Sequence, residues 1–127
     1  MHRIFDHVDL RVASVEASQP FYDALLPAVG FSENDVDGSG LLYYFRRIDG
    51  RVQEAVTLVD DPEHRPNRAR IAFGAATPED VDRITAIAVA AGATAVEPPA
   101  ACPEYSPTYY AAFFDDPEGN ALEIVYR

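Results

Sequence analysis

The chain has 127 residues, 48% of them hydrophobic and 24% charged, which is enough for one folded domain but too few for two ordinary ones. Its formal net charge of −11 argues against a nucleic-acid backbone or an anionic membrane as its partner. A single cysteine, Cys102, excludes an internal disulfide. Because the sequence also shows neither a signal-like start nor a membrane-length apolar run, we expect a cytoplasmic protein.

The first half of the chain predicts a strand, a helix and three further strands. Residues 4–12 alternate between apolar and polar types and predict the first strand. A helix is expected over residues 18–31, with Ser18 as its N-cap and Gly30 at its end. Pro27 predicts that regular helix ends near that residue. The three strands that follow are expected at residues 31–36, 41–48 and 53–60.

The second half repeats this order after a linker, residues 60–69, that contains two prolines and many charges. Thr77 and Pro78 predict the start of a helix that Gly92 ends. We therefore expect one domain with two modules, at about residues 1–62 and 68–127. The strands of the second module are expected at residues 70–75, 94–99, 108–114 and 121–127. Aligning the halves places His7 opposite Arg70 and Thr57 opposite Glu123.

Glu123 is the one charged residue in the apolar run "ALEIV" of the last strand. Burying a carboxylate alone is very unfavourable, so Glu123 needs a partner, a metal or water. If the turn "DDPEGN" joins a regular hairpin, the alternation of strands places Tyr109 and Phe113 on the same face as Glu123.

These stretches resemble the vicinal oxygen chelate superfamily, which groups glyoxalase I, bleomycin-resistance proteins and extradiol dioxygenases. The similar segments are "DHVDLRV" with "FYDALLPAVGF", "RIAF" followed by "TPEDVD", and "DDPEGNALEI", and together they cover nearly the whole chain. The resemblance implies an α+β fold in which two βαβββ modules form a cup-shaped open barrel of mixed sheet. It also implies a homodimer.

The resemblance implies metal ligands on the first and last strand of each module, which here are His7, Thr57, Arg70 and Glu123. His7 and Glu123 suit a divalent ion such as zinc, nickel, manganese or iron. Thr57 is a poor ligand, and the guanidinium of Arg70 is permanently charged and has no lone pair to donate. We therefore expect a cup without a standard metal site.

Arg70 then has two other interpretations. It either pairs with Glu123 in the place of the metal's charge, or it clamps a carboxylate or phosphate group of a ligand. Tyr105, Tyr109 and Phe113 would line the cup and suit a small, partly aromatic ligand. The simpler interpretation of these aromatic residues is that they fill the core of the sheet.

The sequence thus predicts a superfamily member that binds a small anionic or aromatic ligand. The alternative is a metal-dependent lyase or isomerase of glyoxalase type, in which His7 and Glu123 bind the metal and Glu123 moves protons. Extradiol ring cleavage is the weakest hypothesis. Such enzymes resemble a His, His, Glu triad with an assisting tyrosine, where this chain has Arg70 and Phe113.

Overall fold

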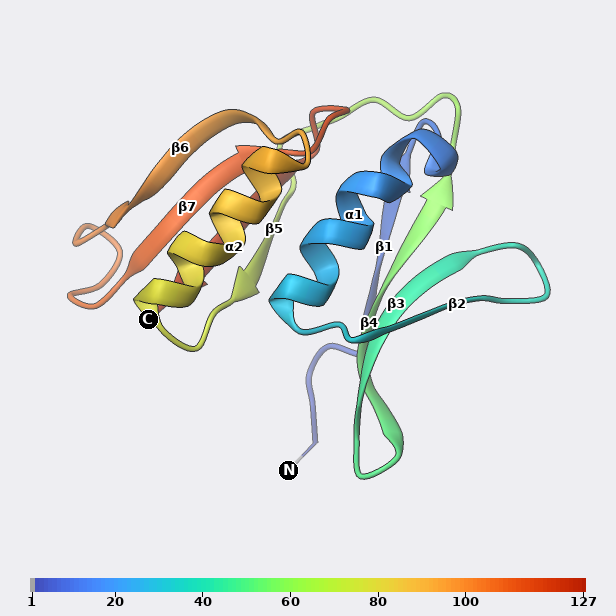
Figure 1. The fold of residues 1–127 in the computed structure, drawn as a ribbon, viewed down its shortest axis with the longest axis horizontal. Coiled ribbons are helices and arrows are strands. Elements are labelled where there is room, and N and C mark those ends of the chain that lie inside the picture. The colour runs from blue at the N-terminus through green and yellow to red at the C-terminus, as the bar shows by residue number, and fades with distance from the viewer. Residues whose placement is uncertain (1) are drawn as a thin grey trace.

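The computed structural model describes residues 2–127 and contains the predicted repeat (Figure 1). The linker connects the two halves, each of which has the order strand, helix and three strands, so this prediction is confirmed. The elements of the first half are β1 (His7–Val12), α1 (Val15–Val29), β2 (Glu33–Val36), β3 (Leu42–Ile48) and β4 (Arg51–Asp60). Those of the second half are β5 (Arg70–Gly74), α2 (Pro78–Ala90), β6 (Thr94–Ala101), β7 (Tyr110–Asp115) and β8 (Ala121–Tyr126).

The strands form two four-stranded mixed sheets, with the orders β1-β4-β3-β2 (sheet 1) and β5-β8-β7-β6 (sheet 2). In each sheet the first and last strands of the module pair in parallel and the other pairs are antiparallel. The residue two positions after His7 pairs with Thr57, and the residue two positions after Arg70 pairs with Glu123. The alignment of the two halves is therefore confirmed residue by residue.

Helix α1 begins earlier than predicted. Ser14 is its N-cap, and the Ser14 hydroxyl oxygen accepts a hydrogen bond from the Ala17 amide at 3.1 Å. The prediction of Ser18 as the cap was wrong, because the Ser18 hydroxyl lies one turn inside the helix and donates to Glu118 at 3.0 Å. Helix α2 begins as predicted, with the Thr77 hydroxyl oxygen accepting from the amide of Asp80 at 3.1 Å.

Pro27 does not end α1, which continues to Val29. A proline in a helix removes one backbone hydrogen bond, but the face that Leu25 and Leu26 bury is held by packing. The helix ends at Gly30 as predicted, where a φ of 133° requires a residue without a Cβ.

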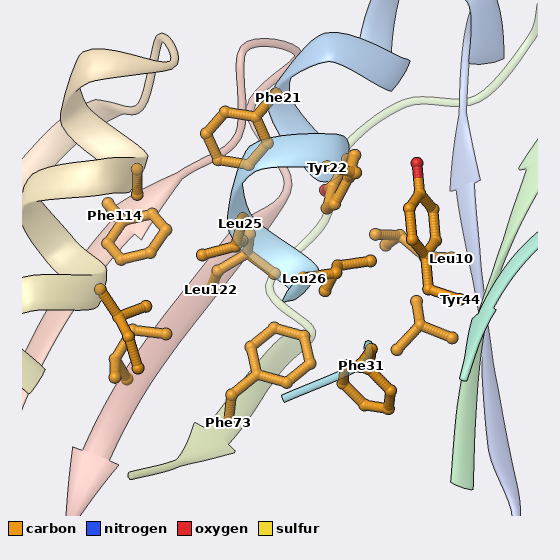
Figure 2. Packing of buried hydrophobic residues seen from close by; sticks show 14 of the residues in the cluster. Leu10, Phe21, Tyr22, Leu25, Leu26, Phe31, Tyr44, Phe73, Phe114 and Leu122 are labelled. Atoms are coloured by element: carbon orange, nitrogen blue, oxygen red, sulfur yellow. The ribbon is translucent and has the colours of Figure 1, made fainter. Parts of the chain in front are cut away.

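Both modules pack on one hydrophobic core, in which α1 lies between the two sheets (Figure 2). Phe114 and Leu122 of sheet 2 lie on one side of the helix, and Leu10 and Tyr44 of sheet 1 lie on the other. Fully burying one leucine stabilises a fold by roughly 1.5–3 kcal/mol, so this shared helix holds the modules together. The buried side chains that α1 contributes are Ser18, Phe21, Tyr22, Leu25 and Leu26.

The turn between β7 and β8, residues 115–120, also joins the modules. Glu118 accepts hydrogen bonds from the amides of Ala13 and Ser14, at 2.6 and 3.2 Å, at the N-terminus of α1. Asp116 is fully buried and accepts a hydrogen bond from the Tyr22 hydroxyl at 2.5 Å. The side-chain amide of Asn120 donates to the same carboxylate at 2.8 Å. Asp116 and Glu118 of "DDPEGN" are therefore structural. No helix within residues 2–127 is long and apolar enough to cross a membrane.

We expect Glu118→Ala to lower the free energy of unfolding by about 1–2 kcal/mol, because the amides of Ala13 and the N-cap Ser14 and the hydroxyl of Ser18 lose their acceptor at the start of α1. The midpoint of thermal unfolding should fall by about 4–6 °C. Calorimetry against Glu63→Ala, an exposed glutamate in the linker, is the measurement. Equal midpoints for the two variants would show that the turn does not stabilise α1.

Candidate functional site

Glu123 lies on a central strand of sheet 2 and is only 5% exposed. Its neighbours Leu122 and Ile124 enter the helix-side core, so Glu123 points to the opposite face of the sheet, here called the outer face. Phe113 is its direct partner across the strand pair. The Tyr109 hydroxyl donates to the Glu123 carboxylate, so the partner that this buried charge requires is Tyr109.

Arg70 does not form the ion pair with Glu123 that the sequence suggested. Among residues 2–127, no nitrogen of Arg70 lies within 4.0 Å of a carboxylate oxygen. The physical reason is register: β5 places Ala72 beside Glu123, whereas Arg70 pairs with Ala121. The Arg70 guanidinium instead lies over the ring of Phe113, with its carbon 4.8 Å from the ring centroid.

A second arginine lies over the neighbouring tyrosine. The Arg127 guanidinium carbon is 5.0 Å from the ring centroid of Tyr109. Burial, reinforced by the hydrogen bond to Glu123, raises the pKa of Tyr109 to about 12. Its phenol therefore stays protonated and continues to donate at neutral pH. Burial also raises the pKa of the Cys102 thiol, with Glu104 adding to the effect, so a thiolate is disfavoured there.

A pocket of about 240 Å³ opens on the outer face of sheet 2 and is called the sheet-2 pocket. Arg70, Tyr105 and Phe113 line it, so three of the four predicted ligand residues meet there. Tyr109 packs beside the pocket, with its ring centroid 5.0 Å from that of Tyr105. The remaining wall is formed by Glu97, Pro98, Ala100, Cys102, Glu104 and Ala111.

The sequence did not predict Glu97 and Glu104 as site residues. Glu97 lies on β6, whose pairing with β7 shifts register on both sides of that residue, so alternation does not place it. Glu104 lies in the loop before β7, where no periodic pattern assigns a direction. Two acidic residues flanking "PPAACP" were the only available signal.

A second pocket, of about 320 Å³, lies between the edge strands β1 and β5 and is called the inter-module pocket. His7 and Arg70 both line it, so the two equivalent positions of the repeat do meet. Phe31 and Phe73 are also in its wall, with ring centroids 6.2 Å apart in an edge-to-face arrangement. Arg70 lines both pockets and stands where they adjoin.

The residues at the four family positions do not fit a divalent metal. His7 is exposed, and its Nδ1 lies 2.8 Å from Asp6 Oδ1, a hydrogen bond that raises the pKa of the imidazole. Glu123 is bonded to Tyr109, and within residues 2–127 no three His, Cys, Asp or Glu side chains gather as a metal site would require.

We expect Tyr109→Phe to destabilise the fold by about 1–3 kcal/mol at neutral pH, because the buried Glu123 carboxylate loses its donor. The pKa of Tyr109 is raised from 10.0 to about 12, so its stabilising effect should be complete below pH 10 and lost as the pH rises through 12. Denaturant unfolding of both proteins between pH 7 and about pH 12 measures this difference.

Tyr43→Phe is the matched control. Tyr43 lies in the first module and pairs with Thr57, which is the residue equivalent to Glu123. Its hydroxyl makes no hydrogen bond to another residue of the described part, 2–127. A loss for Tyr109→Phe no larger than for Tyr43→Phe would contradict the role of this hydrogen bond.

Comparison with known proteins gives a single family. The profile of the Glyoxalase/Bleomycin resistance protein/Dioxygenase superfamily matches residues 4–124. A glyoxalase/bleomycin resistance protein from Albidiferax ferrireducens is 29% identical, with a TM-score of 0.76 over 98% of this chain and 99% of that one. A fosfomycin resistance protein from Listeria monocytogenes shares the fold at 18% identity, with a TM-score of 0.71 over 100% of this chain and 95% of its own.

A glyoxalase-related enzyme from Fulvimarina pelagi also shares the fold at 18% identity, with a TM-score of 0.72 over 98% of this chain and 88% of that one. A search of curated proteins gives no match. The family profile spans nearly the whole chain, and the two modules have the element order and register that the resemblance implies. The chain therefore belongs to the glyoxalase/bleomycin resistance protein/dioxygenase superfamily.

Proposed function

We propose that the chain binds a small molecule whose anionic group contacts Arg70 and whose flat apolar part lies on Phe113 and Tyr105. The observation that carries this proposal is that Arg70 lines both pockets while no carboxylate within residues 2–127 lies within ion-pair distance of it. In a chain with a net charge of −11, a cation without a carboxylate partner at a pocket is a specific attraction for an anion.

The chemistry of the Arg70 guanidinium suits this role. It lies over the ring of Phe113, and a stacked guanidinium keeps its N–H donors directed outward in the plane of the fork. Such a fork binds a carboxylate or phosphate through two parallel hydrogen bonds. Glu123 does not compete for these donors, because no nitrogen of Arg70 lies within 4.0 Å of its carboxylate.

Metal-free binding is favoured over the glyoxalase-type lyase or isomerase, and over ring cleavage. Both alternatives need a divalent ion with open positions held by several His or carboxylate ligands. Of the four family positions only His7 and Glu123 carry such ligands, because Thr57 is a poor ligand and Arg70 has no lone pair. The name of the Albidiferax relative includes bleomycin resistance, which agrees with small-molecule binding as a class of function.

The test uses a matched pair of probes, 4-ethylbenzoate and its neutral amide, followed by nuclear magnetic resonance titration because ligands this small bind at about millimolar concentration. We expect the parent protein to prefer the benzoate, and Arg70→Gln to weaken benzoate binding about tenfold while leaving the amide unchanged. Arg68→Gln, in the linker, is the control. Thermal unfolding of Arg70→Gln should lie close to that of the parent, because Arg70 is exposed, forms no ion pair within residues 2–127 and loses only its contact with the Phe113 ring.

Two outcomes would contradict the proposal. One is benzoate binding that is equal in the parent and in Arg70→Gln. The other is tight, stoichiometric zinc binding by the parent protein, which would favour the metal-dependent alternative.

We also propose that the chain forms a homodimer. The strands β2 and β6 are the outer edges of their sheets, and Val36 and Val96 on these strands are 57% and 36% exposed. Exposed sheet edges with apolar side chains are normally covered in solution. Light scattering should give twice the mass of one chain at micromolar protein, and a single-chain mass would contradict the proposal.

A further inference from the structure

The sheet-2 pocket carries negative charge as well as the positive charge of Arg70. Glu97 pairs with Phe113 across β6 and β7, and Glu104 belongs to the loop that follows β6. Both line the pocket. Within residues 2–127, neither carboxylate lies within 4.0 Å of an arginine or histidine nitrogen. The pocket therefore holds two acidic groups that have no counter-ion within the described chain.

An exposed aromatic ring accompanies these carboxylates. Tyr105 lines the same pocket, is 60% exposed, and packs with its ring centroid 5.0 Å from that of Tyr109. An aromatic face attracts an ammonium or guanidinium group, and carboxylates bind the same group through charge-assisted hydrogen bonds. Carboxylates beside an available tyrosine ring are thus the recognition elements for a cation.

The positive and negative side chains that line the sheet-2 pocket restrict which charged groups its ligand can carry. A ligand with only an anionic group would bind Arg70 but would meet Glu97 and Glu104 as like charges. A ligand with only a cationic group would meet Arg70 in the same way. A ligand with both groups meets an opposite charge at each of them, and the apolar side chains that complete the lining, among them Pro98 and Ala100, suit an uncharged body.

We propose that the sheet-2 pocket selects an amphoteric small molecule, with an anionic group at Arg70 and an ammonium or guanidinium group at Glu97 and Glu104 beside Tyr105. This inference rests on the proposed function and adds to it the second charge of the ligand. Glu123 is not part of the cation site, because its carboxylate bonds to Tyr109 and is 5% exposed.

The test compares 4-(aminomethyl)benzoate with 4-ethylbenzoate, two probes of nearly the same shape that differ by one positive charge. We expect the parent protein to bind the amino compound about tenfold more tightly. In the double variant Glu97→Gln and Glu104→Gln this preference should fall to about one, because the amides keep the shape of the glutamates but not their charge. Glu63→Gln, in the linker, should keep the full preference.

Arg70→Gln separates this inference from the proposed function. It should weaken both probes by a similar factor and leave their ratio unchanged, since both carry the same carboxylate. Equal affinities of the two probes for the parent, or an unchanged ratio in the double variant, would overturn the amphoteric inference alone. The single variants of Glu97 and Glu104 replace the double variant if its amide spectrum shows that it does not fold, and each should then lower the ratio.

Discussion

The carboxylate of Glu118 supplies hydrogen-bond acceptors at the start of α1. A helix needs such acceptors from outside, because its first amides have none within the helix itself. In this chain the acceptor for the amides of the N-cap Ser14 and of Ala13 before it comes from the other module, and the negative charge suits the positive end of the α1 dipole. Asp116 in the same turn receives the Tyr22 hydroxyl, so two acidic residues of one turn bind two successive turns of one helix. The next residue after this turn begins β8, the strand that carries Glu123.

One hydrogen bond on the outer face of sheet 2 explains why the buried carboxylate of Glu123 needs no arginine partner. Because Tyr109 donates to Glu123, the buried carboxylate is satisfied without a cation, and the two nearby arginines lie over aromatic rings. A stacked arginine keeps its donors available to solvent or to a ligand, whereas a paired arginine does not.

The sequence predicted the features that depend on local pattern or on internal symmetry. The element order, the cap at Thr77 and the equivalence of His7 with Arg70 all follow from alternation, turn residues and the repeat. It also placed Phe113 on the face of Glu123, because a tight turn fixes the register of a hairpin. Ser18 was misassigned because Ser14 and Ser18 are both acceptable caps, and distant contacts distinguish them: Asp60 accepts from the Val15 amide, and Glu118 accepts from the Ser14 amide and the Ser18 hydroxyl.

The features that the sequence did not predict depend on contacts across the fold. The register between β5 and β8 moves Arg70 away from Glu123, and no pattern within either strand gives that offset. Glu97 reaches the pocket through an irregular strand, where the period of two no longer holds. Positions that are set by tertiary packing or by a bulge have no signature within a window of one element.

The contact between Glu118 and the start of α1, which joins the two modules, also forms late in the synthesis of the chain. The amides of Ala13 and Ser14 find their acceptor at a residue 105 and 104 positions later. During synthesis from the N-terminus, the first module is therefore complete while the start of its helix still lacks its partner. Closing so long a loop is a late and entropically unfavourable event. The strand β5, whose residues line the inter-module pocket, pairs with β8, so this pocket also takes its final shape only after the last strand has been made.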